Sequence, residues 1–284
     1  MKKGYVDYNV GVKYIMIFVI ELLIRTCLET VYLAGMIILI GLFLGVLRNS
    51  AIRNFQRSFG SKALMITGVI GVPIHEVSHA IFALIFGHKI KKIKLFQKPD
   101  ENGVMGYVQH SYKQGSIYQQ IGNFFIGIAP IFGGIFSIIA LMRIIIPQAY
   151  ADFISILVKS FKVTVLNKST IEAMINSYIG LLKVIFSLQN FKNPYFYIFI
   201  FVAICISSHI SLSSADIRGA SRGLGLVFII LFILNILDLS KYILGINLIR
   251  YNILVTGILM VAVILSIITY LISFVLSVIK HKYD

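Results

Sequence analysis

The sequence predicts an all-α polytopic membrane protein with about six transmembrane helices and a small β-hairpin. Apolar residues make up 58% of the 284-residue chain, charged residues only 13%, and the mean hydropathy is +0.90. A soluble domain of this length cannot hide so much apolar surface, whereas lipid can solvate it. The net charge is +15, but the lysines and arginines are scattered between apolar runs. This pattern is typical of loops that face anionic lipid, so the bilayer is the expected partner and nucleic acid is not.

The first element is expected to be one long or tilted helix over two apolar runs within residues 14–47. The first run is too short to cross a bilayer alone, since about 20 apolar residues are needed, so it is expected to begin at the membrane interface. Glu21, Arg25 and Glu29 follow at helical spacing, and they can pair along one face. The basic stretch at 48–62 predicts a short loop.

The second apolar stretch, residues 63–87, is long enough to span and holds His75, Glu76 and His79 in its middle. Positions i and i+4 lie on one face of a helix, so both imidazoles can bind one metal ion. Glu76 projects to one side, where it can reach a water on that metal. This is the His-Glu-x-x-His arrangement of zinc hydrolases. Polar groups in hydrocarbon usually mark a site, although two histidines bonded to nearby carbonyls are the alternative.

Residues 88–112 predict a β-hairpin directly after the metal-binding helix. Basic and apolar side chains alternate over residues 92–95, and turn-forming residues gather at 99–103. The apolar side of the hairpin is expected to rest on the membrane-embedded helices. A strand edge beside a catalytic site can bind an extended peptide by backbone pairing, and a basic hairpin can equally bind lipid headgroups.

Further apolar runs predict four more spans, at residues 121–146, 195–214, 224–246 and 253–279. Small residues in the first of these let helices approach closely. The segment 147–193 is amphipathic and is predicted to lie on the membrane surface or to cover the bundle. The chain is thus expected to form a single membrane-embedded domain, 1–284, that ends in a C-terminal helical pair, 223–284.

A zinc site needs a third protein ligand and one open position for water. Four residues are candidates for it: Asp216, His209, His110 and Asp238. Asp216 and His209 are seven residues apart, so they share a face if one helix covers both. A carboxylate is preferred, because two neutral histidines, one aspartate and a hydroxide leave the site nearly neutral in a low dielectric. Asp238 is expected to act as a cap or to pair with Lys241.

These motifs resemble those of the site-2 protease family of intramembrane zinc metalloproteases, over residues 63–222. In that family the His-Glu-x-x-His helix is followed by a β-hairpin, a helix with a Gly-Pro-x-x-Asn-like motif, and a helix whose Leu-Asp-Gly segment supplies an aspartate ligand. The corresponding positions here are His75, Glu76 and His79, Ala129-Pro130-Ile-Phe-Gly133, and Asp216 in Asp-Ile-Arg-Gly219. Gly133 stands where the family has Asn, and Asp216 lacks the flanking Leu and Gly, which indicates a divergent member.

The resemblance implies an enzyme that cleaves a peptide bond in or near a transmembrane segment of a membrane protein or membrane peptide. It implies Zn²⁺ as cofactor, held by the two motif histidines and Asp216, with Glu76 as the catalytic residue. Tyr107 and Asn123 are candidate substrate-binding residues. The family topology places the hairpin on the cytoplasmic side of a bacterial cell membrane. A count of 13 basic residues in the inside segments against 6 in the short outside loops agrees with it.

Two other functions use the same features. A membrane scaffold or chaperone can retain the fold and the metal without proteolysis, and a metal-handling transporter can use the same histidines. A binding module has no use for Glu76 at its position. A transporter needs polar residues along several spans, whereas the last two spans are almost wholly apolar. No oligomeric state is predicted.

Overall fold

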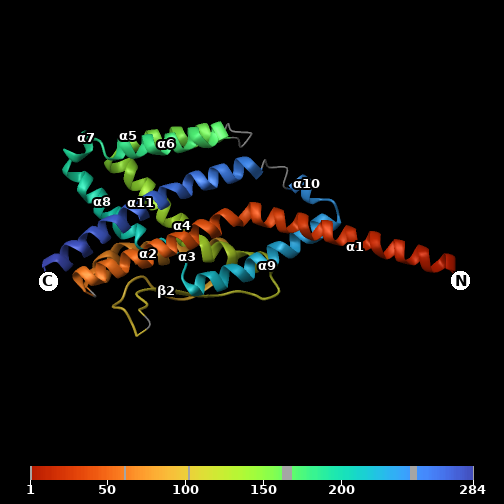
Figure 1. Ribbon diagram of the computed structural model, residues 1–284. Helices are drawn as coiled ribbons and strands as arrows, with labels where there is room; N and C mark the ends of the chain where they lie inside the picture. The colour runs from red at the N-terminus through yellow and green to blue at the C-terminus, as the bar shows by residue number, and fades with distance from the viewer. Residues whose placement is uncertain (1, 61, 102, 162–167, 244–247, 284) are drawn as a thin grey trace.

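The computed structural model describes residues 2–60, 62–101, 103–161, 168–243 and 248–283 (Figure 1). Most of these residues are helical, and the sheet among them has two strands. Six helices in the described part are long and apolar enough to cross a membrane. The prediction of an all-α polytopic membrane protein with a small hairpin is therefore confirmed.

The elements follow one another along the chain in a simple order. The helices are α1 (Lys2–Thr30), α2 (Met36–Phe59), α3 (Lys62–Ile85), α4 (Ile117–Ile145), α5 (Pro147–Phe161), α6 (Lys168–Ile185), α7 (Leu188–Phe191), α8 (Pro194–Ser207), α9 (Ser214–Ile236), α10 (Ser240–Ile243) and α11 (Leu248–Tyr283), with a π-helical turn, η1 (Val31–Gly35), after α1. The strands are β1 (Lys89–Lys94) and β2 (Tyr107–Ser111). The candidate spans are Val12–Phe59, Leu64–Ile85, Ile117–Ile145, Ile171–Phe191, Ser214–Ile236 and Tyr251–Lys280.

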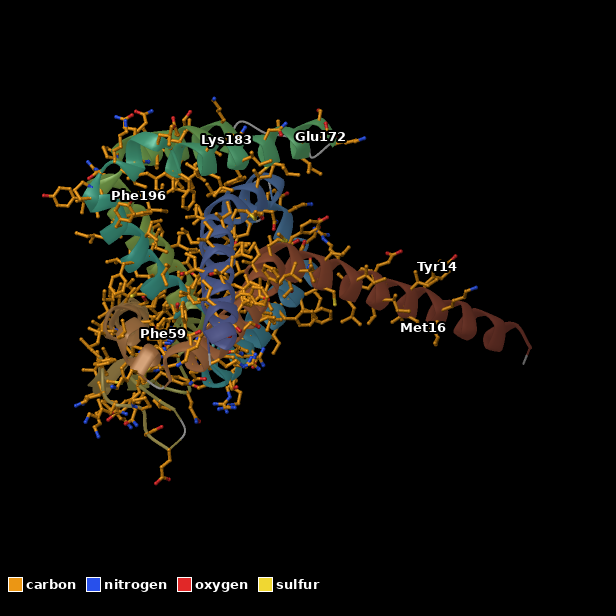
Figure 2. All side chains as sticks on the ribbon, turned by 60° about the vertical axis from the view of Figure 1, so that its left-hand side comes forward. Tyr14, Met16, Phe59, Glu172, Lys183 and Phe196 are labelled. Carbon is orange, nitrogen blue, oxygen red and sulfur yellow. The ribbon has the colours of Figure 1, made fainter. Side chains whose placement is uncertain are left out.

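The first candidate span is one continuous helical rod of α1, η1 and α2, which bends near η1 (Figure 1). Its 48 residues measure about 72 Å at 1.5 Å per residue, more than twice the roughly 30 Å of a hydrocarbon core. The rod therefore cannot cross upright over its whole length, in agreement with the predicted long or tilted helix. The part of α1 that carries Tyr14 and Met16 projects away from the bundle (Figure 2).

The basic loop predicted at residues 48–62 is wrong, because α2 continues to Phe59 and α3 begins at Lys62. The arginines of this stretch stand on α2. The opposite face of α2 is buried, and its buried residues follow the helical spacing i, i+3, i+4 and i+7: Ala51, Asn54, Phe55 and Ser58. The Asn54 side chain donates to Ser273 Oγ at 3.2 Å, so packing against α11 extends the helix through the basic residues.

A buried polar cluster joins α1 to the far end of α9. Asn235 Nδ2 donates to Thr26 Oγ1 at 3.0 Å and to Glu29 Oε2 at 2.8 Å. Arg25 pairs with Glu29 at 3.3 Å, as its spacing predicts, and its Nη2 donates to Ser240 Oγ at 2.8 Å. The polar residues of α1 therefore attach the rod to α9 and to the first residue of α10.

Helices α5 and α6 lie side by side across one end of the bundle (Figure 2). Tyr178, Leu181 and Ile185 of α6 are buried against the core, whereas Ile171 and Ile175 are exposed. Ile171–Phe191 meets the length and composition of a span, so the surface location of this amphipathic segment stays a prediction.

Two of the predicted span boundaries are wrong. The span expected to reach residue 214 ends at Ser207, because α8 has only 14 residues, about 21 Å, which is less than a bilayer core. The next span begins at Ser214, ten positions before the expected start at 224, and ends at Ile236. A turn therefore separates α8 from α9, and the last span is α11, as expected.

Helix α4 lies at the centre of the bundle and packs against α3, α5, α8, α9 and α11. Its isoleucines at 128, 131, 135 and 138 are fully buried. The predicted close approaches at small residues are present. A Cβ at Gly127 would lie 2.6 Å from the Asp216 carbonyl oxygen, and one at Gly134 would lie 2.3 Å from Ile210 Cγ1. These glycines let the turn before α9 and the first residues of α9 rest directly on α4.

Candidate active site

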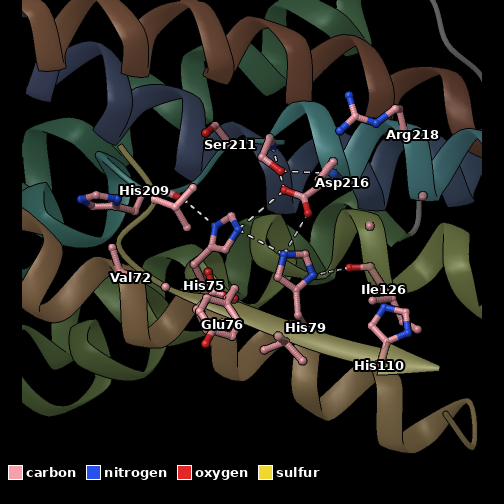
Figure 3. A pocket seen from close by; sticks show the side chains of 18 of the residues that line it. Val72, His75, Glu76, His79, His110, Ile126, His209, Ser211, Asp216 and Arg218 are labelled. Carbon is pink, nitrogen blue, oxygen red and sulfur yellow. Dashed lines mark hydrogen bonds and ion pairs between the residues drawn. The ribbon is translucent and has the colours of Figure 1, made fainter. Parts of the chain in front are cut away.

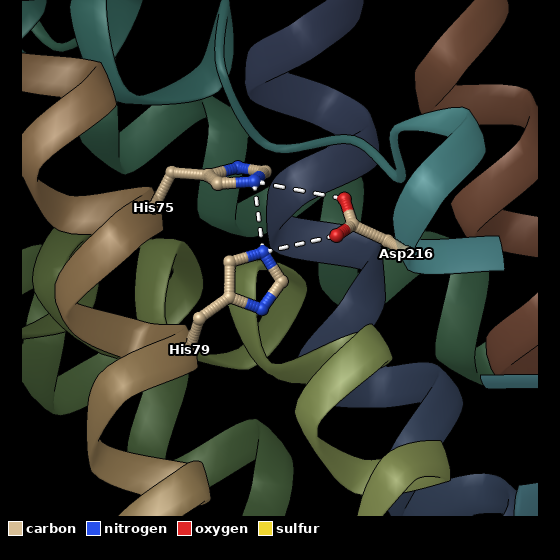
Figure 4. Close-up of side chains that lie close together, drawn as sticks. All are labelled: His75, His79 and Asp216. Carbon is tan, nitrogen blue, oxygen red and sulfur yellow. Dashed lines mark hydrogen bonds and ion pairs between the residues drawn. The ribbon is translucent and has the colours of Figure 1, made fainter. Parts of the chain in front are cut away.

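His75 and His79 leave the same face of α3, one turn apart, and their Nε2 atoms lie 3.1 Å apart (Figures 3 and 4). Each ring is fixed by its other nitrogen. His75 Nδ1 lies 3.0 Å from the His209 carbonyl oxygen, and His79 Nδ1 lies 2.8 Å from the Ile126 carbonyl oxygen. A carbonyl only accepts, so each Nδ1 carries a hydrogen and each neutral Nε2 presents a lone pair. This is how backbone groups orient histidine ligands toward a metal.

Asp216 reaches the same point from the first turn of α9. Its Oδ1 lies 3.1 Å from His79 Nε2, and its Oδ2 lies 3.7 Å from His75 Nε2 (Figure 4). A reciprocal capping box holds this turn: Asp216 N–H donates to Ser213 Oγ at 3.1 Å, and Ser213 N–H donates to Asp216 Oδ2 at 2.7 Å. The carboxylate is thus aimed by the start of the helix that carries it.

No single helix carries both His209 and Asp216, because α8 ends at Ser207 and α9 begins at Ser214, so the condition for a shared helical face is not met. His209 lies in the turn between them and contributes its carbonyl oxygen. Its ring lies against α3, with Nε2 3.4 Å from Thr67 Oγ1. The signal for this turn was readable in the sequence, since Ser213-x-x-Asp216 has the spacing of a capping box.

The donor set fits a zinc ion. Among the described residues, His75, His79 and Asp216 are the group of three whose ligand atoms all lie within 4.8 Å of one another. Tetrahedral coordination at zinc bond lengths separates ligand atoms by about 3.3–3.5 Å, close to the 3.1 Å and 3.7 Å observed here. Two lone pairs 3.1 Å apart repel each other unless a cation, a proton or a metal ion, lies between them.

His110 and Asp238, the other candidates for the third ligand, do not belong to this group. Asp238 follows the C-terminus of α9 at a φ of +53°, and it pairs with Lys241, as predicted, and with Arg25. The hydrogen bond from Lys241 lowers the pKa of the exposed Asp238 carboxyl.

Glu76 is buried, 7% exposed, and it lines a cavity of about 670 Å³ together with the His75, His79 and Asp216 side chains (Figure 3). It lies outside the ligand group. The segment before β2 folds over it: a Cβ at Gly106 would lie 2.9 Å from Glu76 Cγ, so only glycine allows this approach. The structure therefore encloses the glutamate beside the cluster.

The hairpin forms the outer wall of the cavity. β1 and β2 pair antiparallel, with an irregularity between Ile90 and Lys92, so the predicted hairpin is confirmed. The candidate substrate-binding residues Tyr107 and Asn123 both line the cavity, from β2 and from α4. Ser211 and Arg218 lie on the side of the cavity formed by α9 and the turn before it (Figure 3).

Two features of the site were not anticipated. Arg48, Arg218 and Arg222 also line the cavity, and Arg48 Nε donates to the Ser208 carbonyl oxygen at 3.3 Å. Gly133, the position of the family's Asn, faces α3 instead, where an added Cβ would lie 1.8 Å from Ser78 Oγ. An asparagine has no room there, and Gly133 is not part of the cavity wall.

A multi-pass membrane protein with two histidines and a carboxylate converging beside an enclosed glutamate has the architecture of a membrane metallopeptidase. A family model described as Peptidase M50B-like matches residues 59–224, more than half of the chain. The chain belongs to this family and is, at the family level, a membrane metalloprotease, which confirms the resemblance to site-2 proteases. No curated protein and no solved structure matches the chain.

Proposed function

We propose that this chain is a zinc-dependent intramembrane endopeptidase of the bacterial cell membrane, which hydrolyses a peptide bond in or near a transmembrane segment of a membrane protein. One observation carries the proposal. The Nε2 atoms of His75 and His79, on the membrane-length helix α3, converge within 4.8 Å with the carboxylate of Asp216 on α9, and Glu76 lies next to His75 on α3. These three residues would hold the Zn²⁺ ion.

When bound, zinc supplies Lewis-acid activation of water and of the scissile carbonyl. Glu76 accepts the proton of the attacking water and passes it to the leaving amine. The carbonyl oxygens of His209 and Ile126 keep both Nδ1–H groups engaged, so the lone pairs stay directed at the cation site. The hairpin and α9 enclose the reaction and limit the access of bulk water.

The substrate must present an extended segment, because the carbonyls within a regular helix are hydrogen-bonded and shielded. β2 pairs only with β1 in the described sheet, and the chain from Val104 to Val108 lines the cavity. Strand addition along this edge would hold the unwound segment open. Tyr107 and Asn123 are proposed to contact it from two sides of the cavity.

The test combines zinc stoichiometry with cleavage of a membrane peptide by the purified protein and by Glu76→Gln. We expect one zinc per chain in both proteins, and cleavage only by the first. Full cleavage by Glu76→Gln would contradict the proposed mechanism. Bound zinc without cleavage by either protein would indicate a scaffold, and zinc movement across sealed vesicles would indicate a transporter.

A further inference from the structure

A second histidine pair, His88 and His110, lies beside the cavity that holds the three proposed ligands, and His110 lines this cavity. His88, which is 3% exposed, immediately precedes β1, and His110 stands on β2. Their Nδ1 atoms lie 2.9 Å apart, and His88 Nε2 lies 2.7 Å from the carbonyl oxygen of Gln119 in α4. The Tyr112 ring stacks on His88, with the ring centres 5.1 Å apart. The two rings are therefore held in fixed positions.

When both rings are neutral, these contacts determine where the hydrogens are. The Gln119 carbonyl can only accept, so His88 Nε2 must carry a hydrogen. A neutral His88 then has its lone pair on Nδ1, and His110 must donate to it from its own Nδ1. His110 consequently has an unprotonated Nε2, on the opposite edge of its ring from His88. Burial and the nearby His88 and His79 lower the pKa of His110 to about 4, so it is neutral at pH 7.

His110 Nε2 is thus a preorganised hydrogen-bond acceptor, because its lone pair and the orientation of its ring are set before a ligand binds. His110 is among the residues that line the cavity, and within the described chain no hydrogen bond engages its Nε2. It is not one of the clustered ligand atoms. A peptide that enters the cavity brings buried backbone N–H groups, each of which needs an acceptor. The carbonyls of His209 and Ile126 already accept from the ligand histidines.

We propose that His110 is a substrate-binding residue whose Nε2 accepts a hydrogen bond from a backbone N–H of the bound peptide. His88 is the positioning residue that fixes the tautomer and the orientation of His110. The inference rests on the proposed peptidase function. It gives the hairpin a side-chain contact for the peptide backbone in addition to strand pairing.

The binding test uses the zinc-loaded protein with a peptidyl hydroxamate, the same compound N-methylated at one backbone nitrogen after another, and acetohydroxamate, which has no peptide backbone. We expect His110→Phe to lower the affinity for the peptidyl hydroxamate about three- to tenfold, the range for one neutral hydrogen bond. The compound N-methylated at the nitrogen that donates to His110 should bind the wild type and His110→Phe with equal affinity. Acetohydroxamate should also bind the two proteins with equal affinity. Gln109→Phe, at the exposed neighbouring position on β2, is the matched control. If His110→Phe lowered the affinity for every compound by the same factor, the inference would be overturned.

The tautomers are tested separately by ¹⁵N NMR of histidine-labelled protein. We expect hydrogens on His88 Nε2 and His110 Nδ1. His88→Asn keeps an amide oxygen near the former Nδ1 position, so it should preserve the His110 tautomer and the peptidyl affinity, whereas His88→Leu should lose both. A hydrogen on His110 Nε2 in the neutral protein would overturn the inference. Failure of every hydroxamate to bind the wild type would instead refute the zinc peptidase, and the substrate role with it.

Discussion

Replacing Gly127 by alanine tests whether the contact between α4 and α9 sets the position of Asp216, the third proposed ligand. An added Cβ would lie 2.6 Å from the Asp216 carbonyl oxygen, 2.8 Å from Ala220 Cβ and 3.0 Å from Ala220 N. These neighbours are backbone atoms and a Cβ on a helix, so no flexible side chain can turn away. The start of α9 must shift by about 0.8 Å to restore an ordinary contact.

A shift of this size exceeds the roughly 0.2 Å tolerance of a metal–ligand distance. We expect the zinc affinity of Gly127→Ala to fall about 10- to 100-fold, as for other changes that displace a ligand. Overpacking should also lower the free energy of unfolding by about 1–3 kcal/mol. Zinc affinity is measured by competition with a chromophoric chelator, and stability by thermal unfolding in the same detergent.

Gly225→Ala is the matched control, because an added Cβ at Gly225, also in α9, meets nothing within 4 Å. It should bind zinc like the wild type. A folded Gly127→Ala protein that binds zinc with unchanged affinity would refute the reasoning, since the position of Asp216 would then not depend on this contact.

Three further changes have defined outcomes. Ser213→Ala removes the hydroxyl that accepts a hydrogen bond from Asp216 N–H. The free energy of unfolding should therefore fall by about 1 kcal/mol, and zinc should dissociate faster from the chain. Asn235→Ala removes both hydrogen bonds to α1, so that among the described residues only Arg25 still pairs with the side chain of Glu29, which is 13% exposed. Thermal unfolding should show that the free energy of unfolding falls by about 1–3 kcal/mol. Lowering the pH should weaken zinc binding in chelator competition, because both histidines must be deprotonated to bind the metal, and protons should be taken up as zinc leaves.

Each of the two substitutions has a control in the chain. Ser221→Ala, an exposed position in α9, should leave the zinc dissociation rate unchanged, and Asn49→Ala, exposed on α2, should leave the stability unchanged. Equal effects of Ser213→Ala and Ser221→Ala would show that the capping box does not hold Asp216. A zinc affinity that stays constant as the pH falls would exclude histidine ligands.

Local patterns in the sequence were sufficient for several elements. The helical period places His75 and His79 on one face whatever the remainder of the chain does. The turn residues between Pro99 and Gly103 predict the hairpin in the same way, from neighbours along the chain. The burial pattern of α2 was also readable at Ala51 and Phe55, but Arg53 between them, with Arg48 and Arg57 on either side, suggested a loop. Basic residues are compatible with a helix when one face remains apolar.

The location of Asp216 shows the limit of such patterns. The resemblance to site-2 proteases identified the residue, but not the turn that separates it from His209. The side chain reaches the histidines because Gly127 and Gly223 let α9 lie directly on α4, a contact between segments about a hundred residues apart. The contact between Gly133 and Ser78 likewise depends on how closely α3 and α4 approach where they cross.

By itself, the sequence determined that this chain belongs in a membrane, that one helix carries two histidines and a glutamate at hydrolase spacing, and that a hairpin follows it. Only the tertiary structure decided how Asp216 reaches the histidines, which carbonyls orient them, and that His88 fixes His110 at the cavity wall. The reason is physical. Composition and periodicity depend on nearest neighbours along the chain, whereas a site built from α3, α4, β2 and α9 depends on how closely distant helices can approach.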